Sequence, residues 1–155
     1  MVTWFYFIML ILTLVILGAF IIRNKSVDTI FMLFGLSVVV ICLGEYIMAG
    51  ANTLETAIIG NEFVYVGGCY APLLILTILA KLCKINIPRL LLGFLCAYST
   101  IVLGLTMTIG VNKLYYTDIK LVRVDGYSYL EKVYAPLHIL YPLMMMLYAL
   151  IMIGF

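Results

Sequence analysis

Hydrophobic residues fall into five long runs along the chain, and shorter polar segments separate them. A helix that spans a bilayer needs about 20 mostly apolar residues, and each run is close to this length. Five transmembrane helices are therefore predicted, at residues 2–22, 29–49, 63–80, 90–110 and 134–155. The polar segments between them are predicted to be loops, among them a second loop at residues 50–62.

The fourth loop, before the last run, has a different pattern. β-Branched and aromatic residues alternate with polar ones on both sides of Asp125 and Gly126. An Asp-Gly pair between such segments is a strong signal for a β-hairpin. We predict a small hairpin within residues 115–133. Because an isolated hairpin is marginally stable in water, it is expected to lie against the mouth of the helix bundle or the second loop.

Composition changes the interpretation from a packed globule to a membrane protein. Of the 155 residues, 66% are hydrophobic and 10% are charged, whereas soluble domains are about 45–50% apolar and about 25% charged. A chain this short cannot bury so much apolar surface in one aqueous core. We predict an all-α integral membrane protein, a single transmembrane domain over residues 1–155 with the lipid bilayer as its partner. The net charge of +2 and the lack of a basic patch argue against a nucleic-acid partner.

Basic residues in the loops predict the orientation. Arg23 and Lys25 lie in the first loop, Lys81, Lys84 and Arg89 lie in the third, and the second has no lysine or arginine. Short loops rich in lysine and arginine stay in the cytoplasm. We therefore expect a multi-pass protein of the cell inner (plasma) membrane. Its N-terminus, second loop and extracellular hairpin face outward, and its C-terminus faces the cytoplasm.

Two ionisable residues interrupt the apolar runs near the predicted outer surface. Glu45 lies near the outer end of the second helix and His138 near the outer end of the fifth, so both fall at a similar depth and could pair. Ionisable residues in a membrane usually face the bundle interior or water. Tyr65, Tyr98 and Tyr141 offer hydroxyls in the same region. We predict that these five residues line a ligand pocket, a polar cluster inside an apolar cavity.

A purely structural interpretation of the two ionisable residues stays open beside the functional one. In that interpretation Glu45 is protonated or reaches interfacial water, and His138 is a neutral histidine bonded to a carbonyl. The sequence has no Cys-x-x-Cys pair, no phosphate-binding loop and no hydrolase motif. We therefore expect no metal site, no cofactor and no enzymatic activity in this chain.

Four stretches carry a pattern that resembles a known family. They are LGEYIMAGANTLETA, NEFVYVGGCYAPLLILTILAKLCK, NKLYYTDIKLV and YAPLHILYPLMMMLYALIMI. Their spacing resembles the N-terminal seven-transmembrane region of bacterial sensor histidine kinases and of some diguanylate cyclases. The matching positions are the acid that closes the second helix, Tyr65, Gly67, Pro72, Leu114, Tyr115, Pro136, His138 and Tyr141.

The resemblance implies a sensory input module of a two-component system, which passes an outside or intramembrane signal to a cytoplasmic output domain. It implies a pocket at Glu45, Tyr65, His138 and Tyr141. The chain departs from the family because helices six and seven and a kinase or cyclase domain are missing, and because Ala135 stands where glycine is expected. We therefore expect a fragment that lacks its output domain, through which the parent protein would form a homodimer.

Two other functions compete with the sensor. One is a small transporter or accessory subunit in which Glu45 carries a proton, since intramembrane acids often do so. Against it, the runs contain one acid and no inverted repeat with matching broken helices. The other is a structural or assembly protein in which Glu45 is merely paired. A proton flux would favour the transporter, and a bound small molecule the sensor.

Overall fold

The structure, a computed structural model, is a helical bundle with a hairpin at one end, and it describes residues 2–23, 28–109 and 112–154. In chain order the elements are α1 (Val2–Arg23), α2 (Thr29–Ala49), α3 (Leu54–Leu82), α4 (Arg89–Thr106), β1 (Tyr116–Val124), β2 (Tyr127–Tyr134), a 3₁₀ turn (Pro136–Ile139) and α5 (Leu140–Ile153). Five helical segments of the described chain are long and apolar enough to cross a membrane, with the 3₁₀ turn joined to α5. The predicted fold of five membrane-spanning helices with a small antiparallel sheet is confirmed.

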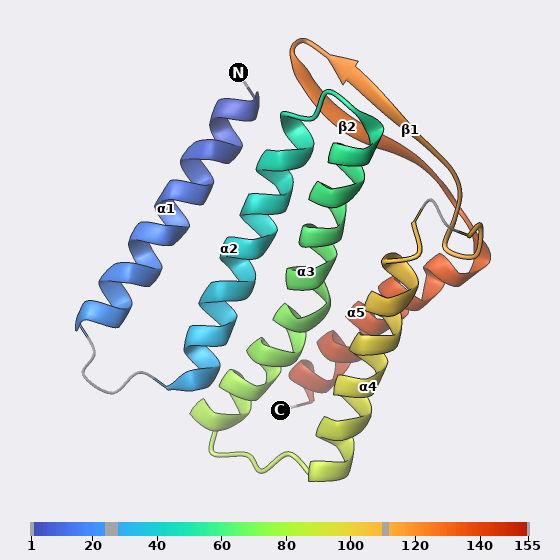
Figure 1. The fold of residues 1–155 in the computed structure, drawn as a ribbon. Helices are drawn as coiled ribbons and strands as arrows, with labels where there is room; N and C mark the ends of the chain where they lie inside the picture. Colours follow the sequence, from blue (N-terminus) through green and yellow to red (C-terminus); the bar gives the residue numbers. More distant parts are fainter. Residues whose placement is uncertain (1, 24–27, 110–111, 155) are drawn as a thin grey trace.

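The helices lie side by side, with α2 between α1 and α3, and with α4 and α5 on the other side of α3 (Figure 1). The hairpin, the N-terminus of α1 and the α2–α3 connection share one end of the bundle, called the hairpin end below. At the other end, Asp28 caps α2 by accepting from the Ile30 N–H at 2.9 Å. The same carboxylate accepts from Lys81 at 2.6 Å, which ties α2 to the last turn of α3.

Close backbone contact holds α2 against α3. A Cβ at Gly44 would lie 2.5 Å from the Gly60 carbonyl oxygen, and one at Gly60 would lie 2.7 Å from the Met48 nitrogen. Two turns along α3, a Cβ at Gly67 would collide with the Ser37 carbonyl oxygen. In a membrane, where lipid is as apolar as leucine, small residues favour helix association by letting backbones approach. The contact fixes the position of α3 along α2, and with it the position of the residues next to Gly60.

The main apolar core lies between α3, α4 and α5. It contains a buried polar pair, in which Ser99 Oγ and Tyr148 Oη lie 2.9 Å apart and Tyr148 also donates to the Leu95 carbonyl at 3.1 Å. A satisfied polar pair fixes how two helices register in an apolar medium. The buried residues of this core are Cys69, Leu73, Leu76, Leu95, Val102, Met144 and Tyr148.

The predicted start of the third helix was wrong. Residues 63–80 were expected, but α3 begins at Leu54, so most of the expected second loop is helical. Thr53 caps the helix by accepting from the Thr56 N–H at 3.2 Å, and Glu55 stands in the first turn, where a negative charge favours the helix dipole. With 29 residues, α3 is about 43 Å long. It therefore extends beyond an apolar layer of about 30 Å and presents polar residues at the hairpin end.

The last two helices also differ from the predicted bounds. The fourth was expected at 90–110, but α4 ends at Thr106, and residue 110 lies outside the described residues. The fifth was expected at 134–155, but Tyr134 belongs to β2 and the α-helix begins at Leu140 after the 3₁₀ turn. Pro136 opens that turn, where its missing N–H costs nothing. Pro142 stands in the first turn of α5, so it does not kink the helix.

The hairpin forms at the predicted Asp-Gly pair and packs on the bundle. Asp125 and Gly126 have φ of 48° and 81°, as a two-residue hairpin turn with the right twist requires. Ser128 Oγ donates to the Ala51 carbonyl at 2.6 Å, and Leu130 packs against Ala51 and Ala57. The sheet thus lies against the α2–α3 connection and the start of α3, which supply the apolar surface that a two-stranded sheet lacks.

Candidate functional site

A lysine on the inner face of the hairpin is the centre of the candidate site. The alternation of β2 turns Ser128, Leu130 and Lys132 toward the bundle. The Lys132 ammonium donates to the Asn61 side-chain oxygen of α3 at 2.5 Å. It also lies 5.7 Å from the ring centroid of Tyr65 and 5.6 Å from that of Tyr116, within cation–π range. Lys132 therefore sits between the hairpin and α3, largely removed from solvent.

The two tyrosines beside this lysine belong to a larger group of aromatic rings. The hydroxyls of Tyr65 on α3 and Tyr116 on β1 are 2.5 Å apart. The Tyr65 ring also meets the Tyr141 ring of α5 edge to face at a centroid distance of 5.2 Å. Tyr115, one residue before β1, lies edge-on to Tyr65 at 6.1 Å and to Tyr116 at 4.9 Å. We call Tyr65, Tyr115, Tyr116, Tyr134, Tyr141 and His138 the aromatic cluster.

His138 joins this cluster from the 3₁₀ turn. Its ring centroid lies 4.0 Å from that of Tyr134, 5.2 Å from that of Tyr115 and 5.7 Å from that of Tyr116. Its backbone N–H donates to the Ala135 carbonyl at 3.0 Å, which closes the turn. The short 3₁₀ turn before α5 therefore brings the histidine under the base of the hairpin.

The structure does not show the suggested pairing of Glu45 with His138. Among the described residues, the ion pairs within 4.0 Å are Lys81–Asp28 and Lys120–Asp118. Lys132 instead lies within electrostatic reach of both Glu45 and His138. The reason is positional: α2 and α5 both pack on α3 and lie on opposite sides of it (Figure 1), while the hairpin brings Lys132 against Asn61 of α3.

Of the five predicted site residues, the structure gathers Tyr65, His138 and Tyr141 in one cluster and Glu45 beside it. Tyr98 lies elsewhere. Its hydroxyl donates to the Leu140 carbonyl at 2.9 Å, and its ring stacks on Phe94 at a centroid distance of 6.3 Å. Tyr98 thus ties α4 to the start of α5 and supports the cluster only indirectly.

Two buried polar atoms at this site have no partner with hydrogen-bond geometry among the described residues. They are the Asn61 side-chain nitrogen and the Tyr115 hydroxyl, on side chains of residues that are 2% and 1% exposed. The Tyr115 hydroxyl lies beside that of Tyr65 without a well-aligned bond. A buried polar group without a partner costs about 1–3 kcal/mol. Native proteins have few such groups, and they often mark places where a water or a ligand binds.

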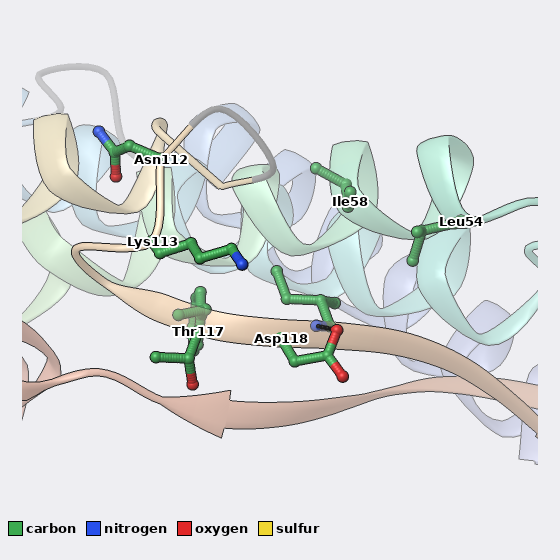
Figure 2. A pocket seen from close by; sticks show the side chains of 8 residues that line it. Leu54, Ile58, Asn112, Lys113, Thr117 and Asp118 are labelled. Carbon is green, nitrogen blue, oxygen red and sulfur yellow. Dashed lines mark hydrogen bonds between the residues drawn. The ribbon is translucent and has the colours of Figure 1, made fainter.

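A pocket opens next to the cluster, on the other side of Tyr116. It has a volume of about 250 Å³ and lies between α3 and β1. Figure 2 shows Leu54 and Ile58 on one side, Thr117 and Asp118 on the other, and the side chain of Lys113 between them. The pocket therefore combines apolar and charged walls and shares Tyr116 with the aromatic cluster.

Comparison with known proteins assigns this arrangement to a family. Residues 5–155 match the N-terminal 7TM region of histidine kinase. The chain belongs to this family. No curated protein and no solved structure matches it in the corresponding comparisons. The expected resemblance is confirmed, and the chain is a membrane-embedded sensor region of the histidine-kinase type.

In this 7TM sensor region, the sequence interpretation missed Lys132, Asn61, Tyr115 and Tyr116 as site residues. Asn61 was assigned to a loop, and Lys132 was placed in the predicted hairpin without a role. A usable signal was present for the lysine. Ser128, Leu130 and Lys132 share one face of the predicted strand, and Leu130 indicates that this face is the buried one. No comparable signal in the sequence identifies Asn61.

Burial changes the proton affinity of the groups at the base of the hairpin. Desolvation lowers the pKa of Lys132, and the nearby charge of Glu45 offsets part of this lowering. Desolvation also raises the pKa of Tyr115 and of Tyr116, so both hydroxyls stay neutral well above the usual range. The protonated Lys132 is therefore destabilised by the loss of water around it, and its hydrogen-bond and ring neighbours are neutral.

Docking of the hairpin in this sensor region is expected to depend on pH through Lys132. Because the pKa of Lys132 is lower when docked than when exposed, the charged lysine disfavours docking. Docking should strengthen as the pH rises from the lowered pKa toward the ordinary value of about 10.4. NMR signals of the Leu130 methyl groups, followed as the pH is raised toward that ordinary value, should shift toward the docked state. The shift should vanish in Lys132→Met. An equal shift in that variant would contradict the assignment.

Proposed function

We propose that this chain is the sensory input module of a bacterial histidine kinase or related signalling protein and detects a small ligand at the hairpin end of the bundle. The observation that carries the proposal is the set of groups around Lys132. Lys132 bonds to Asn61, and two buried polar atoms without partners, on Asn61 and on Tyr115 of the aromatic cluster, lie near a pocket. Such groups reduce stability, and functional sites are where proteins commonly retain that cost. The ligand would contact Glu45, Tyr65, His138 and Tyr141 together with Lys132 and Asn61.

The cluster offers a route from the ligand to the helices. Tyr65, Lys132, His138 and Tyr141 belong to α3, β2, the 3₁₀ turn and α5, and the contacts described above connect them. A ligand that prefers one position of the hairpin would therefore favour one packing of α5 against α3. The mechanism is a population shift, whose size is limited by the ligand's preference between the two packings.

The proposed orientation puts the hairpin end outside the cell. The end of α1 at Arg23, the last turn of α3 with Lys81, and the start of α4 at Arg89 lie at the opposite end of the bundle (Figure 1). Lys84 follows α3 there, and the positive-inside rule favours such a basic end as the cytoplasmic one. The α5 helix runs from the aromatic cluster toward that basic end. An output domain on the cytoplasmic side, in a parent protein of which this chain is a part, would then receive the signal from α5.

Loosening the hairpin without any ligand tests the proposal. Leu130 is 8% exposed and packs against Ala51 and Ala57, so Leu130→Ala should weaken docking by about 2–4 kcal/mol. In a histidine kinase carrying this chain as its N-terminal region, reconstituted in nanodiscs, basal autophosphorylation should change several-fold. Methyl NMR on the chain would confirm that the hairpin is loosened.

Val133→Ala is the matched control, because Val133 lies on the same strand and is 54% exposed. It removes a side chain of similar chemistry without affecting docking, and basal phosphorylation should stay at the level of the unmodified protein. If Leu130→Ala loosens the hairpin but leaves phosphorylation equal to that of the control, the hairpin is not the input element.

A further inference from the structure

We infer that the Lys132 ammonium, between β2 and α3, receives an oxyanion group of the ligand, a carboxylate or a phosphate. The inference rests on the proposed function, because it names the chemistry of the ligand that the same site would take. It is based on the buried polar atoms of Asn61 and Tyr115 that have no partner, and on the positive charge of Lys132 near them.

The charge at the site is a cation without a contacting anion. Among the residues that the structure describes, no carboxylate lies within 4.0 Å of the Lys132 nitrogen. Its hydrogen-bond acceptor is the neutral side-chain oxygen of Asn61, and its other neighbours are the rings of Tyr65 and Tyr116. An ammonium has three protons to donate. A buried cation is costly unless an anion or several acceptors compensate it, so an entering oxyanion would gain a strong charge-assisted bond.

The unpartnered atoms next to this cation are also donors. The Asn61 nitrogen can only donate, and the Tyr115 hydroxyl can donate, and neither has an aligned partner. Asn61 also holds Lys132 through its oxygen, so its free N–H groups lie close to the same ammonium. The cation with the free Asn61 donor beside it, and the Tyr115 hydroxyl next to Tyr65 in the same cluster, favour a ligand group with several acceptor lone pairs and a negative charge. A cationic group would be repelled by Lys132, and a purely apolar group would leave the free Asn61 donor without a partner.

The neighbouring pocket supplies space for the rest of the ligand, next to the cluster. Tyr116 lines the pocket and its hydroxyl bonds to Tyr65, so the pocket adjoins the cluster at this residue. Lys113 lies across the pocket (Figure 2), where it adds a second positive charge on the approach. The apolar wall at Leu54 and Ile58 suits the body of a small organic acid or a lipid headgroup region.

Substitution of Glu45 tests the inference, because it should change the binding of an anion and of a cation in opposite directions. Its carboxylate lies within electrostatic reach of Lys132 without contacting it. It would repel an entering anion, whereas it would attract a cationic ligand. Glu45→Gln should therefore tighten the binding of an oxyanion and weaken the binding of a cation. Asn61→Asp should act differently again, because it places a carboxylate on Lys132 and would mimic the bound state.

The experiment measures hydrogen exchange of the hairpin amides, residues 116–134, in the full chain in nanodiscs. In phosphatidylcholine nanodiscs the probes are benzoate and inorganic phosphate, with benzamide as the neutral counterpart of benzoate and chloride at matched ionic strength. In a second arm, phosphatidylglycerol replaces part of the lipid and no soluble anion is added. We expect the oxyanion, and not benzamide, to slow exchange of the hairpin by about tenfold, as the formation of one charge-assisted bond would predict.

Four variants separate the outcomes. Lys132→Gln should abolish the protection, Glu45→Gln should produce it at a severalfold lower concentration of the anion, and Asn61→Asp should show it without any anion. Lys120→Gln is the control, because Lys120 is an exposed lysine on the same hairpin. Protection by benzoate or phosphate that requires Lys132 supports the inference with a soluble source. Protection by phosphatidylglycerol that requires Lys132 supports it with a lipid source.

The inference is overturned if neither source gives Lys132-dependent protection, or if Glu45→Gln weakens the effect. Folding of each variant is checked on the amides of α3, so an unfolded variant is recognised. Failure of the proposed function looks different, since it would appear as an unchanged kinase output when Leu130→Ala loosens the hairpin. A changed output together with no oxyanion effect would mean that the module is correct and the ligand class is wrong.

Discussion

Replacing Gly44 by leucine is expected to separate α2 from α3 and to destabilise the bundle by about 3 kcal/mol or more. A Cβ at this position would lie 2.5 Å from the Gly60 carbonyl oxygen and 2.7 Å from the Val64 nitrogen. Both are backbone atoms of a helix, so neither can move aside as a flexible side chain would. Unfolding of the chain by sodium dodecyl sulfate in mixed micelles would measure the loss.

The same substitution should also disable the candidate site, because Asn61 follows Gly60 directly on α3. Gly93→Leu is the control. A Cβ at Gly93 would have nothing within 4 Å, and leucine favours a helix more than glycine does. Its stability should equal or slightly exceed that of the unmodified chain. Equal losses in the two variants would show that close contact of α2 and α3 is not what the glycine provides.

A disulfide between positions 51 and 128 is expected to remove control of the output by the hairpin altogether. Ala51 and Ser128 are 2% and 3% exposed, and the Ser128 hydroxyl already bonds to the Ala51 carbonyl. Cysteines at both positions should therefore crosslink on oxidation and hold the docked state, since an intramolecular bond gives a high effective concentration. In the Leu130→Ala background, oxidation should return kinase autophosphorylation from its shifted level to that of the docked protein.

Reduction of the crosslink should restore the shifted level, which separates the lock from permanent damage. The two single-cysteine variants are the controls, in a chain whose exposed Cys83 and Cys96 are replaced by serine. Neither should respond to oxidation. If the oxidised double variant keeps the output of Leu130→Ala although the crosslink forms quantitatively, the position of the hairpin does not set the output.

The sequence by itself determined the membrane-spanning architecture and the hairpin. Five apolar runs in so short a chain require lipid as their surroundings. In lipid, a single run satisfies its backbone N–H and C=O groups by forming a helix. The turn at Asp125 and Gly126 was equally local, because few residue pairs adopt positive φ at both central positions. The family pattern followed from spacing along the same runs. Each of these features depends on residues near one another in the chain.

The tertiary structure alone decided how far α3 extends and which polar groups meet. The stretch 50–62 looks like a loop by hydropathy, yet the Thr53 cap and the contact of Gly44 with Gly60 keep it helical. Hydropathy placed Glu45 and His138 at one depth, but depth does not tell on which side of α3 a helix packs. Lys132 and Asn61 are 71 residues apart in the sequence. They are partners because the docked sheet faces the extended part of α3. Contacts of that range arise from packing, and no local pattern in the sequence encodes them.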